Sequence, residues 1–228
     1  MKPPRSLRSL PPEGVRPALG RPGARPDGSF VYLASQSPRR RELLAQIGVR
    51  HELLLAGPDE DAESLEAEIV GELPSVYVER ATRAKLAAAR RRLAVRALPE
   101  APILCADTTV ALGRRILGKP ADAEDAARTL ALLAGKTHRV ISAVAVASGR
   151  RSRLLASVSR VRFASLTAVQ IDAYVASGEP FGKAGAYAIQ SAAAAWIERI
   201  EGSYTGIMGL PLHETATLLR WAGVVFSP

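Results

Sequence analysis

Three consecutive arginines, Arg39 to Arg41, stand where the sequence predicts the first turn of a helix, in the stretch SQSPRRRELL. The start of a helix carries partial positive charge, so acidic side chains are the usual choice there. A polar turn before a helix start offers free backbone N–H groups, and guanidinium groups match phosphate oxygens in pairs. The arginines are explained if a multiply charged anion binds beside Ser35. The alternative is a solvated basic turn whose charge Glu42 reduces.

The second candidate is Asp107, inside the apolar stretch ILCADTTVAL. Burying an ionised carboxylate is costly unless it binds a metal, pairs with a cation or lies at the open end of a strand. Lys119 follows a dozen residues later in LGKP, after a tight turn. A carboxylate near lysines and a phosphate site suits metal-assisted phosphoryl chemistry. A structural ion pair between Asp107 and Lys119 is the alternative.

Three further candidates each have an ordinary structural explanation. Glu60, in the acidic stretch PDEDAE, could join Asp107 in holding Mg²⁺, because hard cations prefer carboxylate oxygens; a solvated acidic loop is the alternative. Lys85 lies in YVERATRAKLAAA, on a helix face where lysines are usually exposed to solvent. Gln190, in GKAGAYAIQ, has a donor and an acceptor that can read the edge of a base, whereas a tight β-turn explains the same stretch without a ligand.

Alternating apolar and amphipathic segments must position these residues. Strands are predicted at FVYLA, HELLLA, ILCADTTVAL, KTHRVISAVAVAS and SRLLASVSRVRFASL. Helices are predicted after Ser37, at 74–93, at 123–133, from the capping box of Thr167 and Gln170 to Gly178, and in LPLHETATLLRWAG. KAGAYAIQ and AAAAWIERI are predicted as strands or extended loops. This alternation indicates an α/β fold with one mixed sheet.

The composition narrows the classes of partner without choosing among them. A chain of 228 residues with 47% hydrophobic residues can form one substantial core or two small lobes. A net charge of +9 suits nucleic acid, anionic lipid or a nucleotide. Only 5% of the residues are aromatic, which argues against a stacking platform for single-stranded nucleic acid. No apolar run reaches the roughly 18 residues of a membrane-spanning helix, and a single cysteine, Cys105, indicates a reducing compartment.

Residues 1–29 differ in composition from the rest of the chain. They are rich in proline, arginine and glycine, with six basic residues against two acidic ones, and they lack the apolar region of a secretory signal. We expect this segment to be disordered because it has little apolar surface to bury. A nonspecific basic tail, an organelle transit peptide and a misassigned start codon remain open. The folded domain is predicted to comprise residues 30–228.

Taken together, these stretches resemble the Maf family of nucleoside triphosphate pyrophosphatases. The segments that carry the resemblance are LASQSPRRRELLAQIG, YVERATRAKLAAA, CADTTVAL with LGKP, LAGKTHRVISAVAV, KAGAYAIQ and GSYTGIMGLP, between Phe30 and Trp221. The resemblance implies a two-lobed α/β fold with a long twisted mixed sheet and flanking helices, similar to inosine triphosphate pyrophosphatase, with a cleft between the lobes. It implies hydrolysis of a nucleoside triphosphate to the monophosphate and pyrophosphate, with Mg²⁺, Mn²⁺ or Co²⁺, by a cytoplasmic homodimer.

The resemblance also assigns roles to individual positions. Asp107 matches the family's catalytic base, which with Glu60 is expected to hold the metal. Base selectivity is tied to the positions of Arg39, Thr108 and Gln190. The phosphate loop and the remaining charged lining of the cleft correspond to Ser35, Arg40, Lys85, Lys119 and Lys183.

The segment KAGAYAIQ resembles the subgroup that acts on dTTP and UTP, with CTP or modified pyrimidine nucleotides as further substrates. A 7-methyl-GTP pyrophosphatase and a non-catalytic nucleic-acid-binding or septum-regulating protein are the alternatives. Three positions depart from the family pattern: Gly182 replaces an aspartate, and Ala188 and Ser191 replace glycines. The loss of the aspartate raises the question of what holds Lys183 in place.

Overall fold

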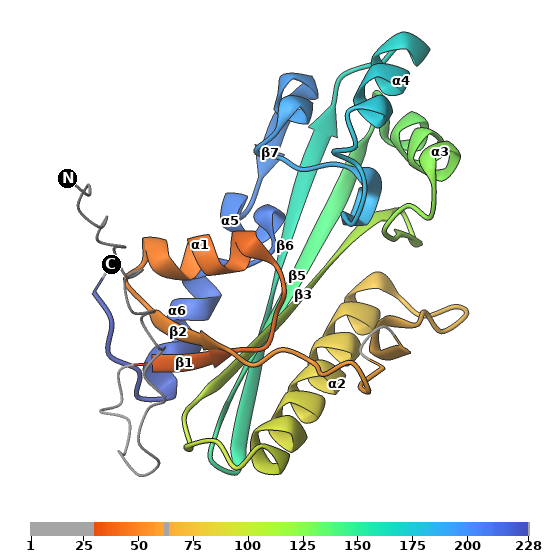
Figure 1. Ribbon diagram of the computed structural model, residues 1–228. Helices are drawn as coiled ribbons and strands as arrows, with labels where there is room; N and C mark the ends of the chain where they lie inside the picture. The colour runs from red at the N-terminus through yellow and green to blue at the C-terminus, as the bar shows by residue number, and fades with distance from the viewer. Residues whose placement is uncertain (1–29, 62–63, 228) are drawn as a thin grey trace, which may run out of the picture.

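One mixed sheet of seven strands runs through the whole domain (Figure 1). The computed structural model describes residues 30–61 and 64–227. The strand order is β2-β1-β3-β5-β6-β7, and β4 pairs with the outer part of β3. The first three strands are parallel, and all pairings from β3 to β7 are antiparallel. The bounds are β1 (Phe30–Leu33), β2 (Arg50–Leu53), β3 (Ile103–Leu112), β4 (Arg115–Leu117), β5 (Thr137–Ser148), β6 (Arg151–Phe163) and β7 (Ile197–Glu201).

Six α-helices of the described residues pack around this sheet. They are α1 (Pro38–Gln46), α2 (Pro74–Val95), α3 (Ala123–Leu133), α4 (Ala168–Ala176), α5 (Tyr204–Met208) and α6 (Leu212–Trp221). The predicted caps form: the side chain of Asp122 accepts from Asp125 N at 2.8 Å, and Thr167 with Gln170 makes a capping box. None of these helices is long and apolar enough to cross a membrane. The predicted mixed α/β sheet with flanking helices is confirmed.

Three short 3₁₀ turns and helix α5 were not predicted. The turns are η1 (Ser64–Glu66), η2 (Ala184–Ala186) and η3 (Ala192–Trp196). KAGAYAIQ therefore forms no strand, and only the second half of AAAAWIERI does so, as β7. The predictions about residues 1–29 lie outside the described residues.

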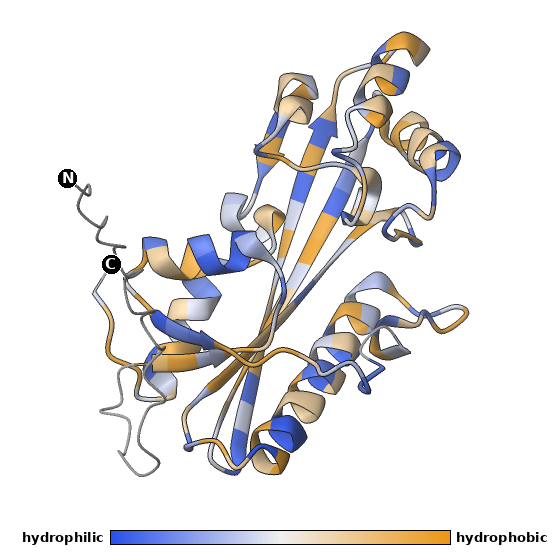
Figure 2. Ribbon diagram, in the orientation of Figure 1, coloured by the Kyte–Doolittle hydropathy of each residue, from blue (hydrophilic) through white to orange (hydrophobic). Residues whose placement is uncertain are grey.

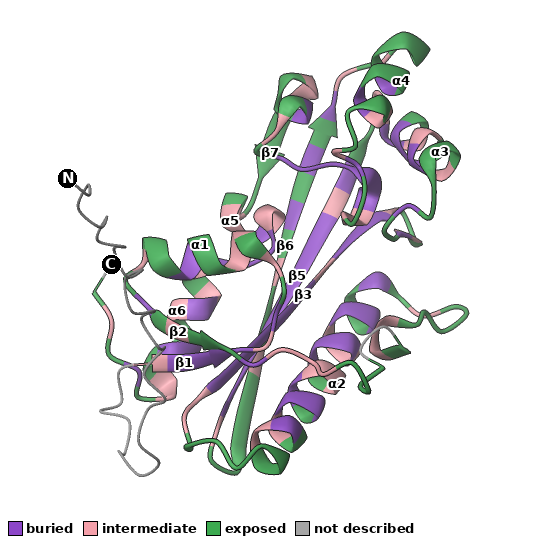
Figure 3. Ribbon diagram, in the orientation of Figure 1, coloured by how far each residue is buried: buried purple, intermediate pink, exposed green. Residues whose placement is uncertain are grey.

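Successive residues of β3 face opposite sides of the sheet, as the strand period of two requires. Ile103 and Cys105 pack in one buried cluster with Leu86 of α2, on the side that α2 covers (Figure 1). Leu104 and Ala106 belong to a second cluster, which α1 and α6 cover with apolar side chains. Figures 2 and 3 show the same pattern, because β1, β3 and β5 are largely apolar and buried. We call this end of the sheet the first lobe.

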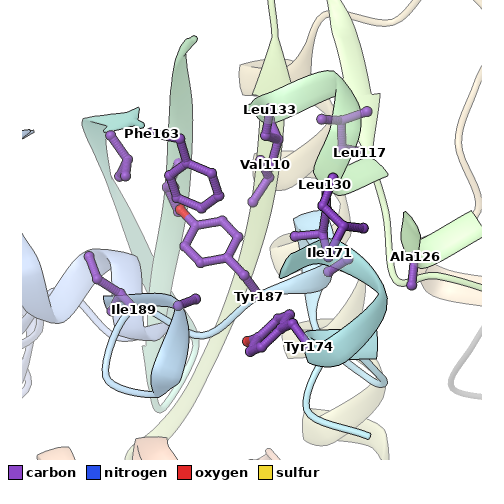
Figure 4. Close-up of a cluster of buried hydrophobic side chains, with 14 residues drawn as sticks. Val110, Leu117, Ala126, Leu130, Leu133, Phe163, Ile171, Tyr174, Tyr187 and Ile189 are labelled. Carbon is purple, nitrogen blue, oxygen red and sulfur yellow. The ribbon is translucent and has the colours of Figure 1, made fainter. Parts of the chain in front are cut away.

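A separate core, the second lobe, forms at the other end of the sheet, around Val110, Phe163 and Tyr187 (Figure 4). Leu130 of α3 and Ile171 of α4 complete it. The long strands β3, β5 and β6 connect the two lobes (Figure 1).

Between the lobes, one edge of β3 is left free. Strand β1 pairs with β3 only at Ile103 and Leu104, and β4 pairs with it only from Val110 onward. In the described part of the chain, no strand covers residues 105–109 along this edge, whereas β5 pairs with them continuously on the other edge. The gap exposes Asp107 and Thr108 to the space between the lobes.

Candidate active site

A cavity of about 530 Å³ opens at the free edge of β3. Its walls come from the turn after β1, the first turn of α1, the middle of α2, the segment after β4 and the loop before η2. Eight of the ten residues that the sequence singled out line it together: Ser35, Arg39, Arg40, Lys85, Asp107, Thr108, Lys119 and Lys183. Among the described lining residues, six are cationic, with Arg92 as the sixth, and two are acidic, Glu66 and Asp107. The cavity is therefore built for an anion.

Carboxylates and ammonium groups alternate along one wall of the cavity. The Lys85 Nζ atom donates to Asp107 Oδ1 at 2.5 Å and also contacts Glu66 Oε1 at 2.7 Å. The second oxygen of Glu66 accepts from Lys119 Nζ at 2.8 Å. Lys85 and Asp107 are mostly buried, with side-chain exposures of 17% and 10%. The lysine that sequence statistics would place in solvent thus lies against the buried carboxylate of β3.

Glu66 lies in a charged and partly buried environment. Burial alone would raise the pKa of Glu66, but the ammonium groups of Lys85 and Lys119 outweigh burial and lower the pKa to about 2. Its carboxylate is therefore ionised at neutral pH, and together with Asp107 it offsets the charges of the two lysines.

The arginines at the start of α1 are partly explained by contacts within the protein. Arg40 Nε donates to the carbonyl oxygen of Gly209 at 2.8 Å, and Arg39 Nε donates to that of Met208 at 3.3 Å. These carbonyl groups lie at the carboxyl end of α5, where a helix carries partial negative charge. Burial lowers the pKa of Arg40, although Asp107 counteracts this effect. The two arginines thus join α1 to α5 while they line the cavity.

Ser35 organises the turn between β1 and α1. Its hydroxyl oxygen accepts from Ser37 N at 3.2 Å and from Arg40 Nη1 at 3.1 Å. Ser37 is the N-cap of α1 as predicted, but its side chain makes no capping hydrogen bond. Ser35 therefore fixes both the backbone of the turn and the direction of the Arg40 side chain.

Thr108 points to the face of the sheet opposite Asp107. Its hydroxyl lies 2.7 Å from the hydroxyl of Ser142 on β5, and Ser142 donates to the carbonyl oxygen of Gly206 in α5 at 2.6 Å. Ser142 is fully buried behind the cavity wall. This chain of hydrogen bonds fixes Thr108 and α5 relative to each other.

Lys183 is held by backbone carbonyl groups. Its ammonium donates to the carbonyl oxygen of Glu179 and, at 3.5 Å, to that of Phe181. Burial, with a contribution from Arg39, lowers the pKa of Lys183. Gly182 has a φ of +71°, a left-handed conformation that glycine adopts at little cost. It lies in the turn whose carbonyl groups, from Glu179 and Phe181, hold Lys183.

Glu60 does not lie with Asp107 in the structure. Its carboxylate pairs with Arg92 at 2.6 to 3.0 Å and accepts from Gly57 N at 3.1 Å. The hydrogen bonds from Arg92, followed by the one from Gly57, lower the pKa of Glu60 to about 2. Arg92 is buried on α2 and requires a counter-charge, which Glu60 supplies. Glu66, and not Glu60, is therefore the carboxylate beside Asp107 in this structure, and the role of Glu60 in metal binding stays a prediction.

Gln190 also lies outside the cavity lining. Its neighbour Ile189 is buried and lines the cavity, whereas Gln190 is exposed on the outer side of the same turn. The turn is closed by a hydrogen bond from Ser191 N to the carbonyl of Ala188 at 3.2 Å, and the Ser191 hydroxyl donates to the same oxygen at 2.9 Å. In this arrangement Gln190 does not reach a ligand in the cavity.

Glu66 could not be identified as a site residue from the sequence alone. It is one of six acidic residues between Asp59 and Glu68, and its selection depends on the fold. The hydroxyl of Tyr77 donates to the carbonyl of Glu66 at 2.9 Å, and Arg80 donates to that of Ala67 at 2.8 Å. These contacts from α2 place Glu66 so that its side chain reaches the lysines.

The carboxylate donors in the cavity are suitable for a hard divalent cation that is also coordinated by the phosphate oxygens of a ligand. Asp107 and Glu66 place carboxylate oxygens around the same ammonium group, and Mg²⁺ is commonly held by one or two carboxylates plus substrate phosphates. No group of three or more His, Cys, Asp or Glu residues of the described chain could hold a metal ion by itself. The donor set thus fits a metal shared with a phosphate ligand.

Comparison with known proteins agrees with this architecture. The family described as "Maf-like protein" matches residues 30–222. A dTTP/UTP pyrophosphatase of Polaromonas sp. (strain JS666) is 62% identical over 199 residues, which cover 87% of this chain and 98% of that protein. Proteins of the same name from Albidiferax ferrireducens and Burkholderia pseudomallei are 59% and 61% identical, over 85% and 89% of this chain and 97% and 98% of their own lengths. The chain therefore belongs to the Maf-like protein family.

Proposed function

We propose that this protein hydrolyses dTTP and UTP to the nucleoside monophosphate and pyrophosphate. The observation that carries the proposal is the cavity at the free edge of β3, where Asp107 lies beneath a cationic lining. The name shared by relatives about 60% identical supports the choice of dTTP and UTP. Because these relatives are named dTTP/UTP pyrophosphatases, a 7-methyl-GTP pyrophosphatase is the weaker candidate.

The cationic side chains would bind the triphosphate. A nucleoside triphosphate carries about four negative charges, which lysine and arginine side chains offset when they line a shielded cavity. Lys85 and Lys119 face the cavity from one side, and Arg39 and Arg40 face it from the start of α1. Their positive charge would stabilise the negative charge that develops on the departing pyrophosphate.

Asp107 would act as the general base. Its Oδ1 accepts from Lys85, so Oδ2 is the oxygen that we assign to the attacking water. The water loses its proton to Asp107 and attacks the α-phosphorus, and the bond from the α-phosphorus to the bridging oxygen breaks. The electron pair of that bond leaves on pyrophosphate, beside the lysines.

A divalent cation, Mg²⁺ with Mn²⁺ or Co²⁺ as substitutes, is part of the proposal. Asp107 and Glu66 are the residues that would hold it together with the phosphate oxygens. When bound, it would neutralise phosphate charge and acidify a bound water.

Base selection is assigned to Thr108 and Arg39, which line the same cavity as Asp107. Uracil and thymine share a carbonyl–imide edge, and a site built on hydrogen bonds rejects bases that leave its polar groups unpaired. A cytoplasmic location and a homodimeric assembly complete the proposal, on the resemblance to the family alone. Light scattering during size-exclusion chromatography measures the assembly.

A panel of nucleoside triphosphates, with separate detection of pyrophosphate and orthophosphate, tests the function. We expect dTTP and UTP to be cleaved fastest, in the presence of Mg²⁺, with pyrophosphate as the first phosphate product. Preferential cleavage of 7-methyl-GTP, or release of orthophosphate from the γ-position, would contradict the proposal.

A further inference from the structure

The carboxylate of Glu66 occupies both lysines to which the proposed function assigns the phosphates. One oxygen lies 2.7 Å from Lys85 Nζ, and the other lies 2.8 Å from Lys119 Nζ. A carboxylate that bridges two ammonium groups resembles two oxygens of a phosphate group in charge and in spacing. An incoming polyphosphate must therefore share these lysines with Glu66 or displace it.

The backbone beneath Glu66 is held by α2, whereas its partner Lys119 is exposed to solvent. Tyr77 and Arg80 of α2 hold the carbonyl groups of residues 66 and 67, at 2.9 and 2.8 Å. Arg80 is itself fixed by two hydrogen bonds to Glu72, at 2.8 and 2.7 Å. The side chain of Lys119 is 56% exposed. The carboxylate of Glu66 is therefore positioned from α2 and pairs with the mostly buried Lys85 as well as with the exposed Lys119.

The nearby charges determine how Glu66 acts on different ligands. A metal-free polyphosphate would place negative oxygens against the Glu66 carboxylate, and like charges at contact distance repel. A polyphosphate that carries Mg²⁺ presents a cation, which prefers carboxylate oxygens as ligands. Asp107, on the other side of Lys85, adds a second carboxylate facing the same space.

We propose that Glu66 is a selectivity residue, which makes the cavity favour polyphosphates that carry a divalent cation over metal-free ones. This inference rests on the proposed function only for the assignment of the lysines to phosphate. It concerns binding, and it stands or falls independently of which base the cavity accepts.

The test measures binding of inorganic tripolyphosphate to the intact chain by titration calorimetry, once with excess EDTA and once with Mg²⁺. The parent chain should bind the Mg²⁺ complex more tightly than the metal-free form. Glu66→Gln removes the charge and keeps the shape. It should bind metal-free tripolyphosphate about tenfold more tightly than the parent chain, the scale of one charge-assisted contact. Its affinity for the Mg²⁺ complex should stay the same or fall.

Two control variants keep the test falsifiable. Glu79→Gln removes one negative charge from the outer surface of α2, where Glu79 pairs with Arg83 at 3.0 Å, and it should bind like the parent chain. Glu66→Asp keeps the charge and should stay within about threefold of the parent chain in EDTA, because the repulsion remains. Equal or weaker binding of metal-free tripolyphosphate by Glu66→Gln would overturn the inference. An equal gain in both conditions would overturn it as well, because Glu66 would then be a competitor without selectivity.

The outcome can be separated from a failure of the proposed function. Suppose that the triphosphate panel shows no pyrophosphate release while Glu66→Gln binds metal-free tripolyphosphate more tightly in EDTA. In that case the selectivity role of Glu66 stands and the proposed reaction is wrong. If the panel gives dTTP and UTP hydrolysis while the calorimetric difference is absent, the reaction stands and the role of Glu66 is wrong.

Discussion

Replacing Lys85 by methionine tests the alternation of charges in the cavity wall. Lys85 Nζ contacts Asp107 Oδ1 at 2.5 Å and Glu66 Oε1 at 2.7 Å, so these two oxygens are at most about 5.2 Å apart. Without the ammonium group, two carboxylates face each other. At an effective dielectric constant of about 20, their repulsion is ~3 kcal/mol, which is also the scale for removing one member of a buried ion pair. We expect Lys85→Met to lower the free energy of unfolding at pH 7 by about this amount.

The assay is urea unfolding at pH 7, with a second substitution to identify the cause. Adding Glu66→Gln to the Lys85→Met variant removes one of the two facing charges and should restore at least ~1 kcal/mol. Lys136→Met makes the same chemical change at an exposed position and should lie within ~0.5 kcal/mol of the parent chain. The reasoning is refuted if Lys85→Met is as stable as the parent chain, or if the second substitution lowers stability further.

Three other substitutions or conditions test the surroundings of the cavity. Gly185→Ala should destabilise the chain by at least ~2 kcal/mol in thermal unfolding, because φ is +72° and an added Cβ would lie 2.8 to 2.9 Å from side-chain atoms of Val110; a neutral effect would show that the loop relaxes. Burial lowers the pKa of His138 from 6.5 to about 4, so the stability due to its neutral ring is fully present above pH 6.5. That stability should fall by ~3 kcal/mol as the pH drops to 4, and urea unfolding of His138→Phe between these pH values should show a flatter dependence; equal slopes would contradict this assignment. Gln190→Ala should change the ratio of UTP to CTP turnover less than about twofold, because the side chain is exposed outside the cavity; a larger change would mean that the turn rearranges when the nucleotide binds.

The regular elements could be predicted because each has a local signal. The long apolar runs of β3 and β5, the strand β6 and the capped helices α3 and α4 lie where the sequence places them. Helix α5 and the turns η2 and η3 have no such signal, because they are short and rich in small residues. Their conformation depends on distant contacts, such as the hydrogen bond from Gly185 N to the carbonyl of Gly118 at 3.0 Å. Elements that tertiary contacts impose cannot be predicted from local pattern.

The residues of the candidate site likewise include some that the sequence could identify and others whose position depends on tertiary contacts. Asp107 stands out because a carboxylate is unusual inside an apolar strand, and the arginines stand out because they lie at a helix start. The resemblance to a known family added Thr108 and Lys183. The choice between Glu60 and Glu66 depends on which acidic residue meets the buried Arg92 and which meets Lys85. No local feature of the acidic stretch carries that information. The outward direction of Gln190 likewise follows from the burial of Ile189.

Single-turnover release of pyrophosphate from dTTP, by the parent chain and by Asp107→Asn, tests the central claim most directly. We expect the variant to lose about 10³-fold in rate, the scale of a missing general base. It should still bind an α,β-methylene analogue of dTTP, because the cationic lining remains. Hydrolysis by Asp107→Asn at near the parental rate would contradict the assignment of the cavity at the free edge of β3 as the active site.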